Sequence, residues 1–422
     1  MKCSVSHPNI APHIKQSILA YQEEGMLHKF YTSYYQHKKY PFSNILIRLF
    51  PGLAKEFRRR NIDDVEYEFL KGSPLPELVR VFAARFLNPM VSNRIWQRNE
   101  LQFDRWVAAN LNGRIQWVHT YEHAALATIR KARSLKIPSF YEQPSQHHTY
   151  LSELLQAELI KYPELNGKAS ELMHDRMAKR CERRKDQELK ECDFIICNST
   201  FTLNTLTNAG IDREKIILIP LGFPPAEEHK REKLNTEKLS FLFAGNQNIR
   251  KGLHILYEAW QNCNFDPLKA ELLIIGKNHL PASLRKGLPP SIKFIPNLLQ
   301  EELNEYYRKA HVFVLPTLAD GFGMVISEAM AKGLAVIATM NSGGPDIIRH
   351  GHNGLLIQAG DADVLASQLR WCFEHPENLI EIGKNALDTA KAYPWSQYRQ
   401  RLRAEVLSRV NGYQALNNLS TS

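Results

Sequence analysis

Two carboxylates, Asp320 and Glu328, flank a glycine-rich loop at a spacing suited to a phosphate-bearing sugar. The apolar run 311–315 before this loop is typical of a buried parallel strand, and residues 324–332 after it have helical composition. Open α/β sheets bind ligands where a strand ends and a helix begins, and backbone N–H groups there favour phosphate. Carboxylates instead accept hydrogen bonds from sugar and ribose hydroxyls. We therefore expect a sugar-phosphate site, with a surface loop and an acidic helix cap as the structural alternative.

A second polar loop, 245–252, carries the adjacent cations Arg250 and Lys251. It follows the apolar run 239–244, a predicted strand, and precedes a predicted helix at 253–262. Cations at the start of a helix oppose its dipole, so their presence there indicates an anionic partner. Two such cations are suited to neutralising a diphosphate.

Three predicted strands in the first half of the chain also end in His or Glu. They are 2–6, followed by His7; 115–119, ending at His119; and 137–142, ending at Glu142. This pattern is typical of a doubly wound sheet with a ligand cleft along one edge, although a lone His7 is more often structural. His119 and His123 have no third ligand nearby in the sequence, so we expect no metal site.

The remaining patterns predict alternating helices and strands on both sides of a linker from Gly222 to Lys238. The predicted helices are 13–24, 93–110, 124–133, 170–191, 201–208, 300–309, 361–392 and 395–410. The other predicted strands are 194–197, 216–219, 271–275, 292–295 and 334–338. Residues 30–86 are expected to be mostly helical, with the basic run 58–60 on a solvated face or against anionic lipid.

Composition indicates an ordinary globular protein of two or three domains. The chain has 422 residues, and its net charge of +10 favours an acidic partner, although a basic surface alone explains the charge equally well. The six cysteines form no CxxC pair and are expected to be reduced thiols. The sequence has no apolar run near the roughly 18 residues of a membrane span and no signal-peptide pattern at its start. We expect a cytoplasmic protein, either free or peripheral at the inner face of the membrane.

Two successive α/β halves imply two Rossmann-like domains facing across a cleft. Four motifs, in the expected order, resemble those of the family-4 retaining glycosyltransferases, which have the GT-B fold and are also called group 1 glycosyl transferases. The motifs occupy residues 192–223, 241–260, 318–348 and 393–402. The resemblance covers most of the chain from Trp117 onward. It implies an acceptor-binding domain at 1–222 and a nucleotide-sugar-binding domain at 223–393. It also implies that a C-terminal helix at about 394–415 crosses back to the first domain.

The resemblance also implies roles for individual residues on the donor side. Asp320 would contact the donor sugar, Glu328 the ribose, and Lys251 the diphosphate. The family commonly has arginine where this chain has Asn246, and Arg250 would supply the missing charge. Two loops that follow predicted strands would complete the donor site. One follows strand 271–275 and contributes Gly276, and the other follows strand 311–315 and contributes Gly321, Phe322, Gly323, Met324 and Val325.

On the acceptor side the chain departs from the family pattern. The loop 7–12 lacks the family's glycines, and Tyr141 and Glu142 occupy a region where the family often has histidine. Glu142 is our candidate catalytic group on this side, beside Asp320, Lys251 and Arg250 on the other. His7 and His119 are candidate binding residues.

The expected activity is retaining transfer of a sugar from a nucleotide-diphosphate sugar to a hydroxyl acceptor, without metal or cofactor. The acceptor would be a sugar or a lipid-linked molecule in glycan, polysaccharide or glycolipid synthesis. We expect a same-face attack in which the donor phosphate helps to deprotonate the acceptor. A nucleotide-sugar epimerase or a phosphorylase on the same fold remains an alternative, as does a basic membrane- or nucleic-acid-binding module. No nucleic-acid motif is present, so nucleic acid is not an expected partner.

Overall fold

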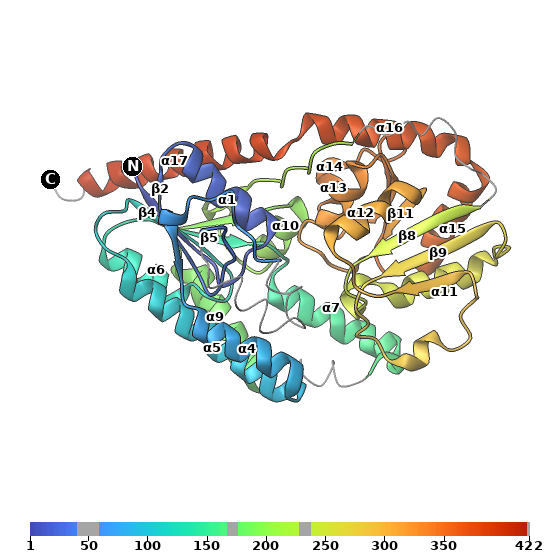
Figure 1. Ribbon diagram of the computed structural model, residues 1–422, viewed down its shortest axis with the longest axis horizontal. Coiled ribbons are helices and arrows are strands. Elements are labelled where there is room, and N and C mark those ends of the chain that lie inside the picture. The colour runs from blue at the N-terminus through green and yellow to red at the C-terminus, as the bar shows by residue number, and fades with distance from the viewer. Residues whose placement is uncertain (40–58, 167–175, 228–237, 420–422) are drawn as a thin grey trace.

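The computed structural model describes residues 1–39, 59–166, 176–227 and 238–419. Figure 1 shows two α/β lobes side by side, with the last helix running along the outside of the first lobe. Each lobe is built on one parallel sheet, and helices cover the sheet faces. Two successive Rossmann-like domains with a returning C-terminal helix are therefore confirmed.

The first sheet has seven strands in the order β3-β2-β1-β4-β5-β6-β7, and every neighbouring pair is parallel. Its strands are β1 Cys3–Ser6, β2 Leu27–Thr32, β3 Leu70–Gly72, β4 Trp117–Tyr121, β5 Ser139–Gln143, β6 Phe194–Cys197 and β7 Ile216–Leu218. The central strands β1, β4 and β5 are buried along their whole length, as strands covered on both faces must be. Their carboxyl ends lie at one edge, where His7, His119 and Glu142 were expected to meet.

The helices of the first lobe are α1 Pro12–Glu23, α4 Pro74–Phe86, α5 Pro89–Asn110, α6 Leu126–Ser134, α7 His148–Lys161, α9 Arg176–Glu191 and α10 Thr200–Asn208. Three of them, α5, α7 and α10, begin after a residue whose side chain accepts a hydrogen bond from a free backbone N–H group. Asn88 accepts from the Val91 amide and Ser199 from the Thr202 amide, so each caps the helix that follows it.

The second sheet has six parallel strands in the order β10-β9-β8-β11-β12-β13. The strands are β8 Leu239–Ala244, β9 Ala270–Ile275, β10 Ile292–Ile295, β11 Val312–Leu315, β12 Ala335–Thr339 and β13 Leu355–Ile357. The helices are α11 Leu253–Cys263, α12 Gln300–Lys309, α13 Met324–Met330, α14 Gly344–Ile347, α15 Ala362–Glu374 and α16 Pro376–Ala392. The order changes direction between β8 and β11, and this topological switch point is where open α/β sheets bind ligands.

The last helix, α17 Trp395–Leu419, packs on the first lobe although it follows the second in sequence (Figure 1). Tyr398, Leu402, Val406 and Val410 recur on one face and join the core of the first lobe. Arg403 donates to Glu23 of α1 at 2.8 Å. The strands of the two sheets fall on either side of residue 222, but the exact domain boundary stays a prediction.

Two predictions about local structure were wrong. The described residues of 30–86 are not mostly helical, because β2 extends to Thr32 and β3 occupies Leu70–Gly72. The sequence LHKFYT of β2 lacks the continuous apolar run of a buried strand, and β3 has only three residues. The predicted helix at 361–392 is broken at His375, because Pro376 cannot continue the hydrogen bonding of the preceding helix.

Two elements of the structure, the helix α7 and the strand β13, have no counterpart among the predicted ones. Residues 40–58 and 170–175 of the predicted helical segments lie outside the described residues. Arg60 is buried in an ion pair with Glu77 instead of lying on a solvated face. All six cysteines are free thiols. Within the described parts of the chain, none of the helices combines the length and apolar character needed to span a bilayer.

Candidate functional site

Two loops of the second lobe meet at the switch point between β8 and β11. Gly252 has a left-handed φ of 69°, and a Cβ there would lie 1.9 Å from the Pro316 carbonyl oxygen, so only glycine permits this approach. The backbone oxygen of Arg250 accepts from the Leu318 amide at 2.8 Å and from the Thr317 hydroxyl at 3.0 Å. These bonds fix the loop that carries the cations against the loop that carries Asp320.

The side chains of Lys251, Arg250 and Asp320 converge where these loops touch. Lys251 Nζ forms an ion pair with Asp320 Oδ2. Arg250 Nη1 lies 3.4 Å from Asp320 Oδ1 and donates to the Ala319 carbonyl at 2.8 Å. The structure thus brings together the three charged residues predicted for the donor side. Two cations share one carboxylate, which leaves the cluster with an excess of positive charge.

Burial and mutual attraction set the ionisation of this cluster. Burial resists the charge on Asp320, but the positive charges of Lys251 and Arg250 outweigh it and hold the pKa of Asp320 below its usual value. Burial, reinforced by the charge of Arg250, lowers the pKa of Lys251, while Asp320 opposes that shift. Taking these ions out of water is costly, so the cluster is better suited to binding than to stabilising the fold.

Glu328 lies on α13, and its side chain contacts residues of α12. Its Oε2 accepts from the Tyr307 hydroxyl at 3.1 Å and from Gln300 Nε2 at 3.4 Å. Burial raises the pKa of Glu328, and these hydrogen bonds partly offset the rise. The contacts described for this side chain do not join it to the Asp320 cluster.

The loop that carries Asn246 is held against the loop that follows β9. Gln247 Nε2 donates to the Gly276 carbonyl at 2.8 Å, and Arg285 Nη2 donates to Gln247 Oε1 at 2.6 Å. A Cβ on Gly276 would lie 2.0 Å from the Gly245 carbonyl oxygen, so glycine is required there too. Asn246 itself is exposed at the tip of the loop.

The glycine-rich loop 321–325 lies at the contact between the two lobes. A Cβ on Gly321 would lie 1.8 Å from the Pro144 carbonyl oxygen of the first lobe. Phe322 is buried in the core cluster of the first lobe, and Met324 packs against that cluster. Val325 packs on the core of the second lobe, and Gly323, with φ 73°, starts α13. The side chains at 322 and 325 are occupied by packing, so their backbone groups remain as candidates for ligand contact.

His119, in the middle of β4, and Glu142, near the carboxyl end of β5, form a fully enclosed pair. Their Nε2 and Oε2 atoms are 3.0 Å apart, and the Tyr21 hydroxyl lies 2.9 Å from His119 Nδ1. Glu142 is 1% exposed. Burial alone would raise the pKa of Glu142, but hydrogen bonding and the charge of His119 outweigh it and hold the pKa below its usual value. This geometry matches a buried structural pair more closely than an accessible catalytic carboxylate.

His7 lies beside this pair at the end of β1. Its ring meets Tyr121 edge-on, with centroids 5.1 Å apart, and burial lowers the pKa of His7 to about 4. The three first-lobe candidates therefore gather in one region of the sheet, although β4 continues to Tyr121, beyond the end predicted for it at His119. Among the described contacts, the link from this group to the Asp320 cluster is the backbone approach of Gly321 to Pro144.

Several residues that the sequence did not point to connect the lobes. Asn341 Nδ2 lies 3.1 Å from the Tyr150 hydroxyl, and the Asn341 carbonyl accepts from the Asp320 amide at 2.9 Å. His254 Nε2 lies 2.8 Å from Glu158 Oε2. Tyr150 and Glu158 belong to α7, the helix that the sequence analysis missed. An apolar repeat within 148–161 could have indicated this helix, but no local signal could have indicated contacts between such distant segments.

Comparisons with known proteins support the resemblance found in the sequence. Residues 238–375 match the model of the family described as Glycosyl transferases group 1. A D-inositol 3-phosphate glycosyltransferase of Streptomyces bingchenggensis is 27% identical over 56% of this chain and 57% of that protein. An amylovoran biosynthesis glycosyltransferase, AmsK of Erwinia amylovora, is 27% identical over 52% of this chain and 56% of that protein. The aligned part of the chain thus spans about half the length of these relatives.

A solved structure shares the whole fold. The crystal structure of Anabaena HepE in complex with UDP and glucose aligns with a TM-score of 0.63 and 16% identity, covering 97% of this chain and 100% of that one. This likeness supports the two-domain architecture over the full length.

Replacing Glu142 with Gln should change how stability depends on pH. Because the pKa of folded Glu142 lies below its unfolded value near about 4.3, the carboxylate stabilises the fold above that pH. This contribution is lost as the pH falls through the lower, folded pKa. The difference in urea-unfolding free energy between wild type and Glu142→Gln should therefore be larger at neutral than at strongly acidic pH.

The exposed Glu405, replaced in the same way, provides the control. A difference between wild type and Glu142→Gln that stays constant across the pH range would contradict the pairing of Glu142 with His119.

Proposed function

We propose that this protein is a glycosyltransferase that moves a sugar from a nucleotide-diphosphate sugar to a hydroxyl acceptor with retention of configuration. The observation that carries the proposal is the convergence of Lys251, Arg250 and Asp320 at the switch point of the second sheet. The match of residues 238–375 to group 1 glycosyl transferases supports the same chemistry for this lobe. HepE, whose structure holds UDP and glucose, supports a nucleotide sugar as the donor.

The ion cluster is suited to stabilising a leaving diphosphate. Asp320 holds a position at Lys251 and Arg250 that a phosphate oxygen can take, because both groups are anionic acceptors of the same donors. When a diphosphate binds, Asp320 is released to accept a hydrogen bond from the donor sugar. The two cations then supply the positive charge without a metal ion. Preorganised charge of this kind contributes roughly 3–4 kcal/mol per well-placed donor.

Glu328 is proposed to hold the ribose of the nucleotide. The Tyr307 hydroxyl and Gln300 Nε2 both reach its Oε2, which leaves Oε1 for a ribose hydroxyl. Asn246, Gly276 and the backbone amides of 323–325 are proposed to line the rest of the donor site. The acceptor would approach from the first lobe, near the loop that contacts Gly321.

Retention is proposed to proceed by same-face attack with the donor phosphate helping to deprotonate the acceptor. A double displacement needs a carboxylate that can reach the anomeric carbon. Glu142 is the first-lobe candidate, and it is enclosed and paired with His119. This enclosure supports a positioning role for Glu142, and His7 and His119 share its buried surroundings.

The acceptor is proposed to be a sugar or a lipid-linked molecule, in polysaccharide or glycolipid synthesis. The relative AmsK is named as a glycosyltransferase of amylovoran biosynthesis, which supports a role of this kind. A screen of nucleotide sugars for thermal stabilisation would identify the donor, because a bound ligand raises stability by mass action. Transfer to an added acceptor would support the proposal. Interconversion of the sugar without an acceptor would indicate an epimerase instead, and a requirement for inorganic phosphate a phosphorylase.

The Lys251→Ala variant should lower the turnover number by about 10²–10³-fold, because it removes one donor to the developing charge on the leaving phosphate. Transfer should be measured with saturating donor, and circular dichroism should confirm that the variant is folded. Lys293→Ala is the matched control, because Lys293 lies on β10 and pairs with Glu271 at 2.6 Å instead of with Asp320. Unchanged transfer kinetics in folded Lys251→Ala would refute the diphosphate role.

The Glu328→Ala variant should raise the KM for the donor by about 10-fold or more while changing turnover of bound donor little, because a hydrogen bond to a charged group contributes about 1.5–3 kcal/mol to binding. Calorimetric titration with the free nucleoside diphosphate gives an independent measure of the loss. If affinity for the nucleotide is preserved while turnover collapses, Glu328 takes part in the chemical step instead.

Peripheral contact with an anionic membrane is also proposed, through an apolar stripe on α4. Leu75, Val79, Phe82 and Phe86 recur at helical spacing and are more than half exposed, and Arg85 is exposed beside them. An apolar helix face bordered by cations is typical of helices that lie in a membrane interface.

A Phe82→Ser, Phe86→Ser double variant should bind phosphatidylglycerol vesicles at least about 10-fold more weakly, because it removes two aromatic side chains from the lipid contact. Co-sedimentation with these vesicles and with neutral phosphatidylcholine vesicles measures the effect. Leu268→Ser, at an exposed apolar position of the second lobe, is the control. Equal sedimentation of the double variant and wild type would exclude this stripe as the contact.

A further inference from the structure

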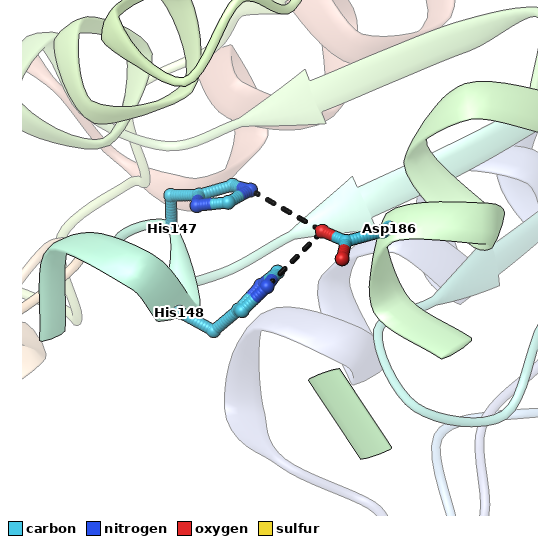
Figure 2. A group of neighbouring side chains, drawn as sticks. All are labelled: His147, His148 and Asp186. Carbon is cyan, nitrogen blue, oxygen red and sulfur yellow. Dashed lines mark ion pairs between the residues drawn. The ribbon is translucent and has the colours of Figure 1, made fainter. Parts of the chain in front are cut away.

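Three potential metal ligands gather at the start of α7, away from the charged cluster of the second lobe. His147 precedes α7, His148 is its first residue, and Asp186 lies on α9 (Figure 2). One ligand atom from each residue lies within 4.8 Å of the others. Figure 2 shows both imidazoles directed at one oxygen of Asp186. From these positions we propose that His147, His148 and Asp186 bind a divalent transition-metal cation, with Zn²⁺ as the foremost candidate.

The distances are close to those of a metal site. His148 Nε2 lies 3.1 Å and His147 Nε2 4.0 Å from Asp186 Oδ1. Ligands around a tetrahedral Zn²⁺ with bonds of about 2.0–2.1 Å are about 3.3 Å apart, so small side-chain rotations complete the arrangement. The Asp186 side chain is 57% exposed and free to make such a movement. Two nitrogen ligands with one carboxylate suit zinc, nickel or cobalt better than magnesium or calcium.

Both imidazoles are largely buried and packed against each other. Their rings lie 4.2 Å apart between centroids, so they would repel each other if both were charged. A neutral imidazole offers the lone pair that a metal needs.

Charge and access at this position also permit a cation. The nearby Lys185 is engaged by Glu122, with Nζ and Oε1 2.7 Å apart. Asp186 lines two adjoining surface pockets, one shared with His147 and the other with His148. Water or an exogenous ligand could fill the remaining coordination positions from these pockets.

One contact opposes binding and sets a limit on the site. His147 Nδ1 accepts from the Thr149 amide at 3.3 Å, and coordination through Nε2 places a proton on Nδ1. The site therefore loses this long hydrogen bond when it binds metal. His148 and Asp186 form the closer pair, so their removal should weaken binding most.

A cation bound at this site would affect how the helix α7 is held in the structure. The helix α7 reaches the second lobe through Tyr150 and Glu158, and the loop just before it contacts Gly321 through Pro144. A metal shared by the start of α7 and by α9 would tie this connecting helix to the first lobe. Binding would then stabilise the fold without taking part in sugar transfer.

The test uses the full chain after dialysis against EDTA, with Zn²⁺ affinity measured by competition with a chromogenic chelator. Wild type should bind one equivalent and show a higher melting temperature with Zn²⁺. His148→Ala and Asp186→Asn should each weaken binding by more than about 100-fold, because loss of a mere supporting residue already costs 10–100-fold. Both variants should also lose the thermal shift.

The exposed pair His350 and His352 of the second lobe supplies the matched control. The double variant His350→Ala, His352→Ala should keep the affinity and the thermal shift of wild type. Asp186 is largely exposed, so Asp186→Asn should fold even if His148→Ala does not. Zinc affinity unchanged in Asp186→Asn, or lost only in the control variant, would overturn the proposal.

Discussion

The arrangement of the second lobe depends on the ion cluster that joins two loops at the switch point of its sheet. Lys251 and Arg250 face Asp320 because Gly252 lets their loop approach Pro316. Neither loop could carry its charge into this position alone, since burying an unpaired ion costs several kcal/mol. The buried charges therefore need their ion pairs, and the close approach of the two loops needs glycine at position 252. A site that already pairs cations with a carboxylate can exchange that carboxylate for a phosphate without exposing a bare charge.

The contact between the lobes is the second constraint, and it is made by Gly321, the residue that follows Asp320. Gly321 approaches Pro144 so closely that no side chain fits, and Phe322 enters the core of the first lobe. On the other side Thr200 donates its amide to Asp346 at 2.9 Å. The loop that carries Asp320 is thus held by both lobes. Because hydrogen bonds also fix this loop to the one that carries the cations, the first lobe contacts the donor-side cluster through Gly321, next to Asp320.

The sequence indicated that Lys251, Arg250 and Asp320 would come together because the signals that mark their loops are local. Glycines, adjacent cations and spaced carboxylates mark the ends of strands β8 and β11, and each of these signals spans only a few residues. The strand β2 was missed because polar residues interrupt its apolar ones, and β3 was missed because it has only three residues. The pairing of Glu142 with His119 could not be read from either residue, since it depends on β4 and β5 lying side by side. For the same reason the sequence offered Glu142 as a catalytic candidate without indicating that it is enclosed.

The helix α7 shows why the missing elements matter for function. It begins at His148, beside Asp186, and contacts the second lobe through Tyr150 in its first turn and through Glu158 in a later one. The helix is also linked to the loop that holds Asp320, because Asn341 contacts Tyr150 and accepts from the Asp320 amide. This path consists of hydrogen bonds between segments far apart in sequence. Its strength therefore depends on the packing of the whole chain, and a fixed geometry at the start of α7 favours a fixed geometry at the donor site.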